Sequence, residues 1–219
     1  MAAFAFSAVV SASASAVLPE FSGTFPTSIK KAVFTKEAKL ETKSGSTVKC
    51  TSFEVTGTLK AAKELESTIA FKGCTASFGA KCTNTANPEE IKVTAGGIPV
   101  YYEKLSKEVG IRALPRELGN QYTEFTCAGI SKVKVRANAA LGGLLCSITP
   151  VNTSTTKYTL TCNGSAIKGV NEITEYENEK GEKVKSFLES SVGGGAFEQS
   201  AEITGAVNFE FEKAVTLKA

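Results

Sequence analysis

The sequence contains no histidine, no tryptophan and no aspartate, so all 22 acidic residues are glutamate. Without histidine, nucleophilic sites of the Ser-His-Asp and Cys-His types are excluded, and so are zinc and iron sites that depend on imidazole. Without aspartate, EF-hand loops and aspartate-based phosphoryl-transfer sites are excluded as well. No GxSxG or supported SxxK motif selects a serine nucleophile. We therefore expect a protein that is not an enzyme and that needs no metal or cofactor.

The sequence also lacks a large excess of either sign of charge. The 25 basic and 22 acidic residues leave a net charge of +3, which is spread along the chain. Arginine, the side chain that recognises phosphate in bidentate fashion, occurs only at Arg112, Arg116 and Arg136. This balance predicts neither a nucleic-acid partner nor an anionic membrane as partner.

The N-terminal residues 1–16 read MAAFAFSAVVSASASA, an uncharged stretch that ends in the small-x-small pattern Ala14-Ser15-Ala16. This pattern is typical of a signal peptide cleaved after Ala16. The stretch has no basic n-region, so we expect either a true start upstream of Met1 or an n-region that has been cut away. Its apolar part is shorter than the roughly 20 residues of a transmembrane helix, and no other segment comes close. We expect a secreted or cell-surface protein without a transmembrane span.

The expected mature chain divides into two parts. Residues 17–30 are rich in Pro, Gly and Ser and are expected to form an extended lead-in. Residues 31–219 are expected to form a single all-β domain, since sandwiches and barrels often reach this size as one unit.

The six cysteines form an even set, which in an exported chain predicts three disulfides. Cys146 and Cys162 flank the turn-like stretch PVNTSTT and face each other if a hairpin centres on Ser154. Facing residues of antiparallel strands lie close enough for a disulfide, so we pair Cys146 with Cys162. Closing this 17-residue loop contributes about 3 kcal/mol on the chain-entropy model.

The other four cysteines allow two arrangements. Cys74 and Cys82 flank a short loop, which favours a local Cys74–Cys82 disulfide and leaves Cys50 with Cys127. A hairpin turning near residue 62 would instead place Cys50 opposite Cys74 and leave Cys82 with Cys127. We slightly prefer the first arrangement, and both stay open.

Short alternating or β-branched runs recur along the chain, with turn residues between them. Ser131–Ala137 (SKVKVRA) and Val207–Leu217 (VNFEFEKAVTL) alternate most cleanly. A turn is expected at Gly96-Gly97, between strands over Ile91–Thr94 and Ile98–Glu103. Roughly a dozen such strands predict an antiparallel β-sandwich or a partly closed β-barrel held together by disulfides.

Two adjacent tyrosines are the candidate ligand-contact aromatics. Tyr101 and Tyr102 lie in one expected strand and must point to opposite faces. One of them is therefore expected on the surface, where a tyrosine can stack on a sugar or a peptide.

Eight segments give the chain a family resemblance. In order they are LPEFSG, TKSGSTVKCTS, FEVTG, AFKGC, EFTCAG, KVKVRA, TPVN and FEQSAEITGAVNFEFE. Together they resemble a large group of exported proteins predicted in soil actinobacteria, over most of the chain after residue 16. The resemblance implies export and an all-β domain, and it implies no activity. The first four cysteines fall on the pattern of that group, whereas the last two are additions, which fits their pairing with each other.

These features predict a secreted or cell-surface structural or adhesion-type protein that is not an enzyme. A cell-wall or other extracellular polymer, or a second copy of the chain, would be its partner. The alternative is an extracellular binding module that holds a carbohydrate or a small apolar ligand between its sheets or inside a barrel.

Overall fold

A computed structural model describes residues 18–84, 89–116, 120–128, 131–140 and 142–219. The expected signal peptide at residues 1–16 lies outside these ranges. Strands make up 69% of the chain, and the described residues contain no α-helix, which confirms the all-β prediction. The structure has 17 strands instead of about a dozen, because several have only two to four residues and are too short to show a period. Within the described ranges, no helix is long and apolar enough to cross a membrane.

The strands are β1 (Glu20–Gly23), β2 (Thr27–Phe34), β3 (Ala38–Thr42), β4 (Thr47–Ala61), β5 (Glu64–Ala76), β6 (Cys82–Thr83), β7 (Glu90–Glu103), β8 (Glu108–Pro115), β9 (Gln121–Cys127), β10 (Ser131–Ala137), β11 (Leu144–Thr149), β12 (Ser154–Cys162), β13 (Glu175–Glu177), β14 (Lys183–Lys185), β15 (Leu188–Val192), β16 (Glu198–Ile203) and β17 (Gly205–Lys218). A single 3-10 turn, η1 (Ser77–Gly79), follows β5.

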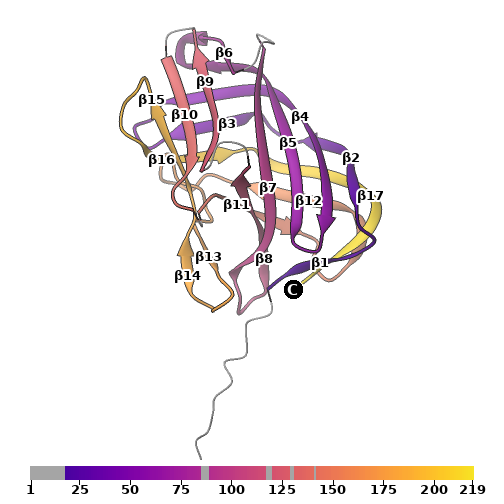
Figure 1. Ribbon diagram of the computed structural model, residues 1–219. Helices are drawn as coiled ribbons and strands as arrows, with labels where there is room; N and C mark the ends of the chain where they lie inside the picture. Colours follow the sequence, from indigo (N-terminus) through magenta and orange to yellow (C-terminus); the bar gives the residue numbers. More distant parts are fainter. Residues whose placement is uncertain (1–17, 85–88, 117–119, 129–130, 141) are drawn as a thin grey trace, which may run out of the picture.

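Eight of these strands form a closed antiparallel barrel in the order β17-β2-β4-β5-β7-β8-β11-β12, with β12 returning to β17. Closure depends on β17, which pairs with β2 along one edge and with β12 along the other. The barrel strands β2, β4, β5, β12 and β17 occupy the right of Figure 1. An eight-stranded barrel is just wide enough to be filled by side chains or to hold one small ligand.

Six further strands form a second layer that continues from β4 in the order β3-β16-β15-β10-β9-β6. This layer lies to the upper left in Figure 1. Its inward side chains, among them Phe125, Val135 and Leu188, join barrel residues such as Phe53 in one hydrophobic cluster. The second layer therefore covers one part of the barrel and shares its core.

The expected lead-in at residues 17–30 is instead largely part of the domain. Strand β1 pairs with β17, where Phe21 lies opposite Leu217, and β2 is a barrel strand. Phe21 is only 1% exposed. Its burial supplies the free energy that holds this segment against the barrel.

The expected turn at Gly96-Gly97 is wrong, because β7 runs unbroken from Glu90 to Glu103. A Cβ atom on Gly97 would lie 3.0 Å from the Ile111 side chain, and one on Gly96 would collide with the Arg116 side chain. These glycines allow neighbouring side chains to approach the strand closely.

The three disulfides join Cys50 to Cys74, Cys82 to Cys127, and Cys146 to Cys162. The predicted Cys146–Cys162 pair is thus present, whereas the preferred Cys74–Cys82 and Cys50–Cys127 pairs are wrong. The reason is the long hairpin of β4 and β5, whose register places Cys50 opposite Cys74. Three disulfides are typical of proteins that fold in an oxidising environment.

Candidate functional site

The two ends of the barrel interior differ in how completely side chains fill them. At one, the packed end, the rings of Tyr158, Phe209 and Phe211 contact one another and Phe21 with centroids 5.3–6.3 Å apart. The Tyr158 hydroxyl donates a hydrogen bond of 2.8 Å to the Val215 carbonyl. The packed end consists of Phe21, Leu59, Leu65, Tyr101, Val109, Ile111, Ile148, Tyr158, Phe209, Phe211, Val215 and Leu217.

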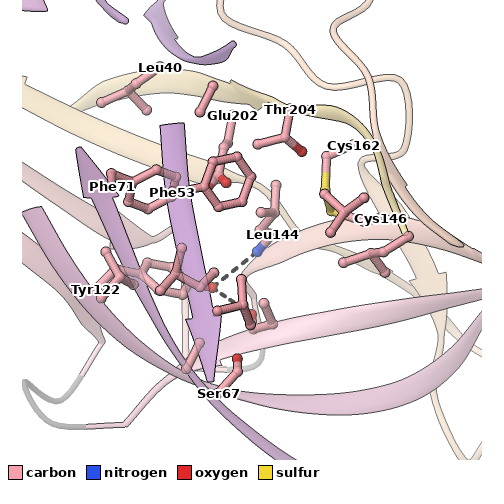
Figure 2. Close-up of a pocket in the computed structure, with 18 of the residues that line it drawn as sticks. Leu40, Phe53, Ser67, Phe71, Tyr122, Leu144, Cys146, Cys162, Glu202 and Thr204 are labelled. Carbon is pink, nitrogen blue, oxygen red and sulfur yellow. Dashed lines mark hydrogen bonds between the residues drawn. A yellow bond between two sulfur atoms is a disulfide. The ribbon is translucent and has the colours of Figure 1, made fainter. Parts of the chain in front are cut away.

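At the other, the hollow end, the interior encloses a cavity of about 180 Å³ beneath the second layer. Figure 2 shows its wall, which is almost entirely apolar. Eight apolar side chains that line it keep accessible surface although they belong to the core, and we take that surface to face the cavity. They are Phe34, Leu40, Val55, Ile69, Phe71, Val93, Ala113 and Leu160.

Small residues at inward positions explain why this end is hollow. Ala32, Ser67, Ala95 and Ala113 all line the cavity. Each stands on a barrel strand at a place where a larger side chain would reduce the empty volume. Their short side chains leave the volume that the aromatic rings occupy at the packed end.

Glu202, on strand β16, is the ionisable side chain that points into this apolar space. It lies opposite Leu40 of β3 in the sheet register, and Figure 2 shows its carboxyl oxygen among the cavity-lining residues. The carboxyl has neither a hydrogen-bond nor an ion-pair partner among the described residues. Burial disfavours its charged form and raises its pKa to about 7.

The backbone of Glu202 is held on both edges, which fixes the direction of its side chain. One edge pairs with β3. On the other edge Asn171, which is 3% exposed, donates to the Glu202 carbonyl at 2.7 Å and accepts from the Glu202 amide at 3.3 Å. The same Asn171 amide group donates to the Asn163 carbonyl at 3.0 Å. Asn171 is thus a positioning residue for Glu202.

Thr204 stands two residues further along the same wall. It is 2% exposed, lines the cavity, and its hydroxyl oxygen has no hydrogen-bond partner. Its amide donates to the Cys162 carbonyl at 3.1 Å, and Gly205 then turns the chain into β17 with a φ of +62°. Buried polar atoms in native proteins are nearly always paired, so this unpaired hydroxyl is unusual.

Tyr122 of β9 also lines the cavity, but its hydroxyl is fully used within the wall. It donates to the Ala113 carbonyl at 2.5 Å and accepts from the Leu144 amide at 3.1 Å, as the dashed lines in Figure 2 show. Burial, together with the nearby Glu202 charge, raises the pKa of this phenol. Tyr122 therefore stays neutral and serves to join β9 to β8 and β11.

A second hollow of about 330 Å³ lies beside the cavity, at the ends of β3, β4, β5, β9, β10 and β15. Leu40 and Val48 line both hollows. Hydroxyl groups of Thr42, Ser46 and Thr47 contribute to the walls of this second hollow. Because the two share side chains, the second hollow is the candidate entry route to the cavity.

The tyrosines predicted to contact a ligand lie elsewhere. Tyr101 is 6% exposed in the packed end, so the expectation of a surface ring does not hold for it. Tyr102 points to the other face and is half-buried beside Glu108, and burial raises its pKa. Neither lines the cavity.

The described residues contain no group of three or more His, Cys, Asp or Glu side chains that could hold a metal ion. The arrangement at the hollow end can surround a small apolar group and offer one carboxyl to it. No protein-family model, curated protein or solved structure matches this chain, so its function has to be inferred from the cavity itself.

Proposed function

We propose that the protein binds a compact apolar molecule in the hollow end of its barrel. The observation that supports this proposal is an apolar cavity of about 180 Å³ inside a closed barrel. Protein interiors are normally packed as densely as organic crystals, so an unfilled volume of this size in a core needs an explanation.

The free-energy cost of leaving the cavity empty also supports ligand binding. At about 24 cal/mol per Å³, leaving a volume of about 180 Å³ without any contents would cost about 4 kcal/mol. A bound apolar molecule would restore the missing contacts. Because a dry engineered cavity of about 150 Å³ binds benzene, the expected ligand has a single ring or a short chain.

The walls of the cavity suit a binding site that keeps its shape. Cys50, Cys146 and Cys162 line it, so two disulfides that join neighbouring barrel strands support its wall. Such a wall favours a small apolar ligand over a carbohydrate, whose hydroxyl groups would find few partners there. The structural or adhesion-type role expected from composition stays a prediction, because no surface feature has been assigned to it.

Binding of ethylbenzene, measured by isothermal titration calorimetry, tests the proposal. Wild-type protein is expected to bind it, and Ala113→Leu, which places a larger side chain in the cavity, is expected to weaken binding at least about 10-fold. The matched control is Ala70→Leu. Ala70 lies between Glu54 and Lys92 on the outer face of the barrel, and this variant should bind like wild type.

Two outcomes would overturn the proposal. One is the absence of binding by folded wild-type protein, with folding checked by circular dichroism. The other is equal binding by wild type and both Ala113→Leu and the smaller change Ala113→Val, since a ligand in the cavity must respond to added volume there.

A further inference from the structure

Building on the proposed binding in the hollow end, we infer that the ligand is a compact apolar amine whose ammonium group binds the Glu202 carboxylate. This inference depends on the cavity being a binding site. It adds the chemical class of the ligand and the side chain that recognises its polar end.

Two features of the wall support it. The Glu202 side chain lines the cavity (Figure 2), and its carboxyl has no hydrogen-bond or ion-pair partner among the described residues. The rest of the lining is almost entirely apolar. Glu202 is thus a polar group with unused hydrogen-bonding capacity in an otherwise apolar chamber.

Two other polar groups near the cavity are already used. The Tyr122 hydroxyl is bonded to Ala113 and Leu144. The Lys39 ammonium forms an ion pair of 2.7 Å with Glu41, on the face of β3 opposite to Leu40. Nothing charged in the described wall therefore satisfies Glu202, and its partner must come from the ligand.

An ammonium group suits this carboxylate better than other polar groups. It carries three donors and no acceptor, so each of its hydrogen bonds can go to an acceptor such as a carboxylate oxygen. A carboxylate ligand would be repelled by Glu202. The rings of Phe53 and Phe71, with centroids 5.2 Å apart, also line the cavity and can receive the apolar body of the ligand.

Proton exchange follows from this pairing. The carboxyl must be ionised to bind an ammonium group, while an alkyl ammonium stays charged across neutral pH. The amine therefore binds well above about pH 7 and loses affinity as the solution is acidified. The titratable group whose pKa responds to the Glu202 charge is Tyr122 of β9, across the cavity wall, which stays protonated throughout because its pKa is raised.

The test compares two ligands of similar size, benzylamine and ethylbenzene, by calorimetry at about pH 8. Wild type is expected to bind benzylamine at least about 10-fold more tightly, because a charge-assisted hydrogen bond forms in an apolar site. Glu202→Gln keeps the shape of the side chain and should lose this preference while it still binds ethylbenzene. Glu212→Gln, at an exposed position of β17, is the matched control and should behave like wild type.

A second measurement repeats the benzylamine titration at about pH 5. Wild-type affinity should fall by up to about 100-fold relative to about pH 8, and the affinity of Glu202→Gln should change little. Ethylbenzene binding by Glu202→Gln should not depend on pH, and wild-type protein should bind ethylbenzene no more tightly at about pH 8 than at about pH 5.

The outcomes separate this inference from the proposed function. If ethylbenzene binds and Ala113→Leu blocks it, but benzylamine binds no better and Glu202→Gln changes nothing, the amine inference is wrong and apolar binding stands. If neither compound binds folded wild type, the proposed function fails and the inference fails with it. Preference for benzylamine that survives in Glu202→Gln would assign the amine to another site and also overturn the inference.

Discussion

The packed end and the hollow end belong to the same eight strands, yet one is solid and the other encloses a cavity. Strand β17 contributes Phe209, Phe211, Val215 and Leu217 to the packed end. On strand β8, Ile111 belongs to the packed end and borders the cavity, and Ala113, two residues later, belongs to the cavity wall alone. The difference thus arises from side-chain size along single strands, and the backbone of a closed barrel is compatible with both.

The two ends therefore contribute differently to the protein. Dense aromatic packing stabilises a fold through dispersion and burial, and it needs no further explanation. An empty apolar volume reduces stability by about 4 kcal/mol at the cavity size found here. The packed end and the disulfides therefore stabilise a domain whose other end remains available for a ligand.

The largest expected effect is the loss of an aromatic ring from the packed end. Phe211 is 1% exposed and contacts three aromatic neighbours, so Phe211→Ala should lower the free energy of unfolding by about 4 kcal/mol. Phe71, which faces the cavity, has fewer contacts to lose, and Phe71→Ala should lower it by about 1–2 kcal/mol. Urea unfolding followed by fluorescence or circular dichroism measures both.

The wild-type chain without ligand is the reference for this pair of variants. Equal losses for the two variants would show that the cavity wall is as well packed as the packed end. That result would remove the contrast between the ends and weaken the case for a binding site.

The next largest effect is expected at Glu202, with a sign that depends on pH. Burial raises the pKa of this carboxyl from its ordinary value of 4.5 to about 7, so folding favours the protonated form. Stability from this group is fully present below about pH 4.5, declines as the pH rises, and is lost above about pH 7. Over that pH range the free energy of unfolding falls by about 3 kcal/mol, because a difference of one in pKa corresponds to about 1.4 kcal/mol.

The neutral variant Glu202→Gln should escape this loss. It is expected to be about 3 kcal/mol more stable than wild type at pH 8 and nearly equal to it at pH 4. Urea unfolding across that pH range, with Glu212→Gln as the exposed control, measures the difference. A constant difference between the proteins at all pH values would contradict a buried, unpaired carboxyl at the hollow end.

Much of the fold follows from local sequence, and the closure of the barrel does not. The alternation of SKVKVRA predicts β10 with its observed bounds, Ser131–Ala137. The facing positions of Cys146 and Cys162 follow from one hairpin turn. Closure, in contrast, depends on β17 pairing with β2, from the opposite end of the chain, and no local pattern encodes such a pairing.

Local sequence does not reveal that Glu202 lines a cavity. In the sequence EQSAEI of β16, alternation places Ala201 and Ile203 on the apolar face and Glu202 toward solvent. In the structure the second layer lies against the barrel, so both faces of β16 are enclosed. Glu54 begins the segment EVTG, which is similar to the segment EITG that Glu202 begins. Glu54 instead lies on the outside and pairs with Lys72 at 2.6 Å. Only the tertiary arrangement distinguishes these two glutamates.

The smallest of the expected effects concerns how the hollow end keeps its shape. The Tyr122 hydroxyl bonds the Ala113 carbonyl of β8 and the Leu144 amide of β11. Tyr122→Phe removes the hydroxyl and leaves those two backbone groups unpaired, which should lower the free energy of unfolding by about 2 kcal/mol. The same variant should also weaken ethylbenzene binding, because the wall beside Ala113 loses its fixed position. Unfolding in urea and calorimetric titration test the two effects, and Tyr102→Phe, on a tyrosine outside the cavity lining, is the control.

If Tyr122→Phe lost stability yet bound ethylbenzene like wild type, this hydroxyl would stabilise the fold without shaping the cavity. The shape of the hollow end would then depend on its small side chains and disulfides alone.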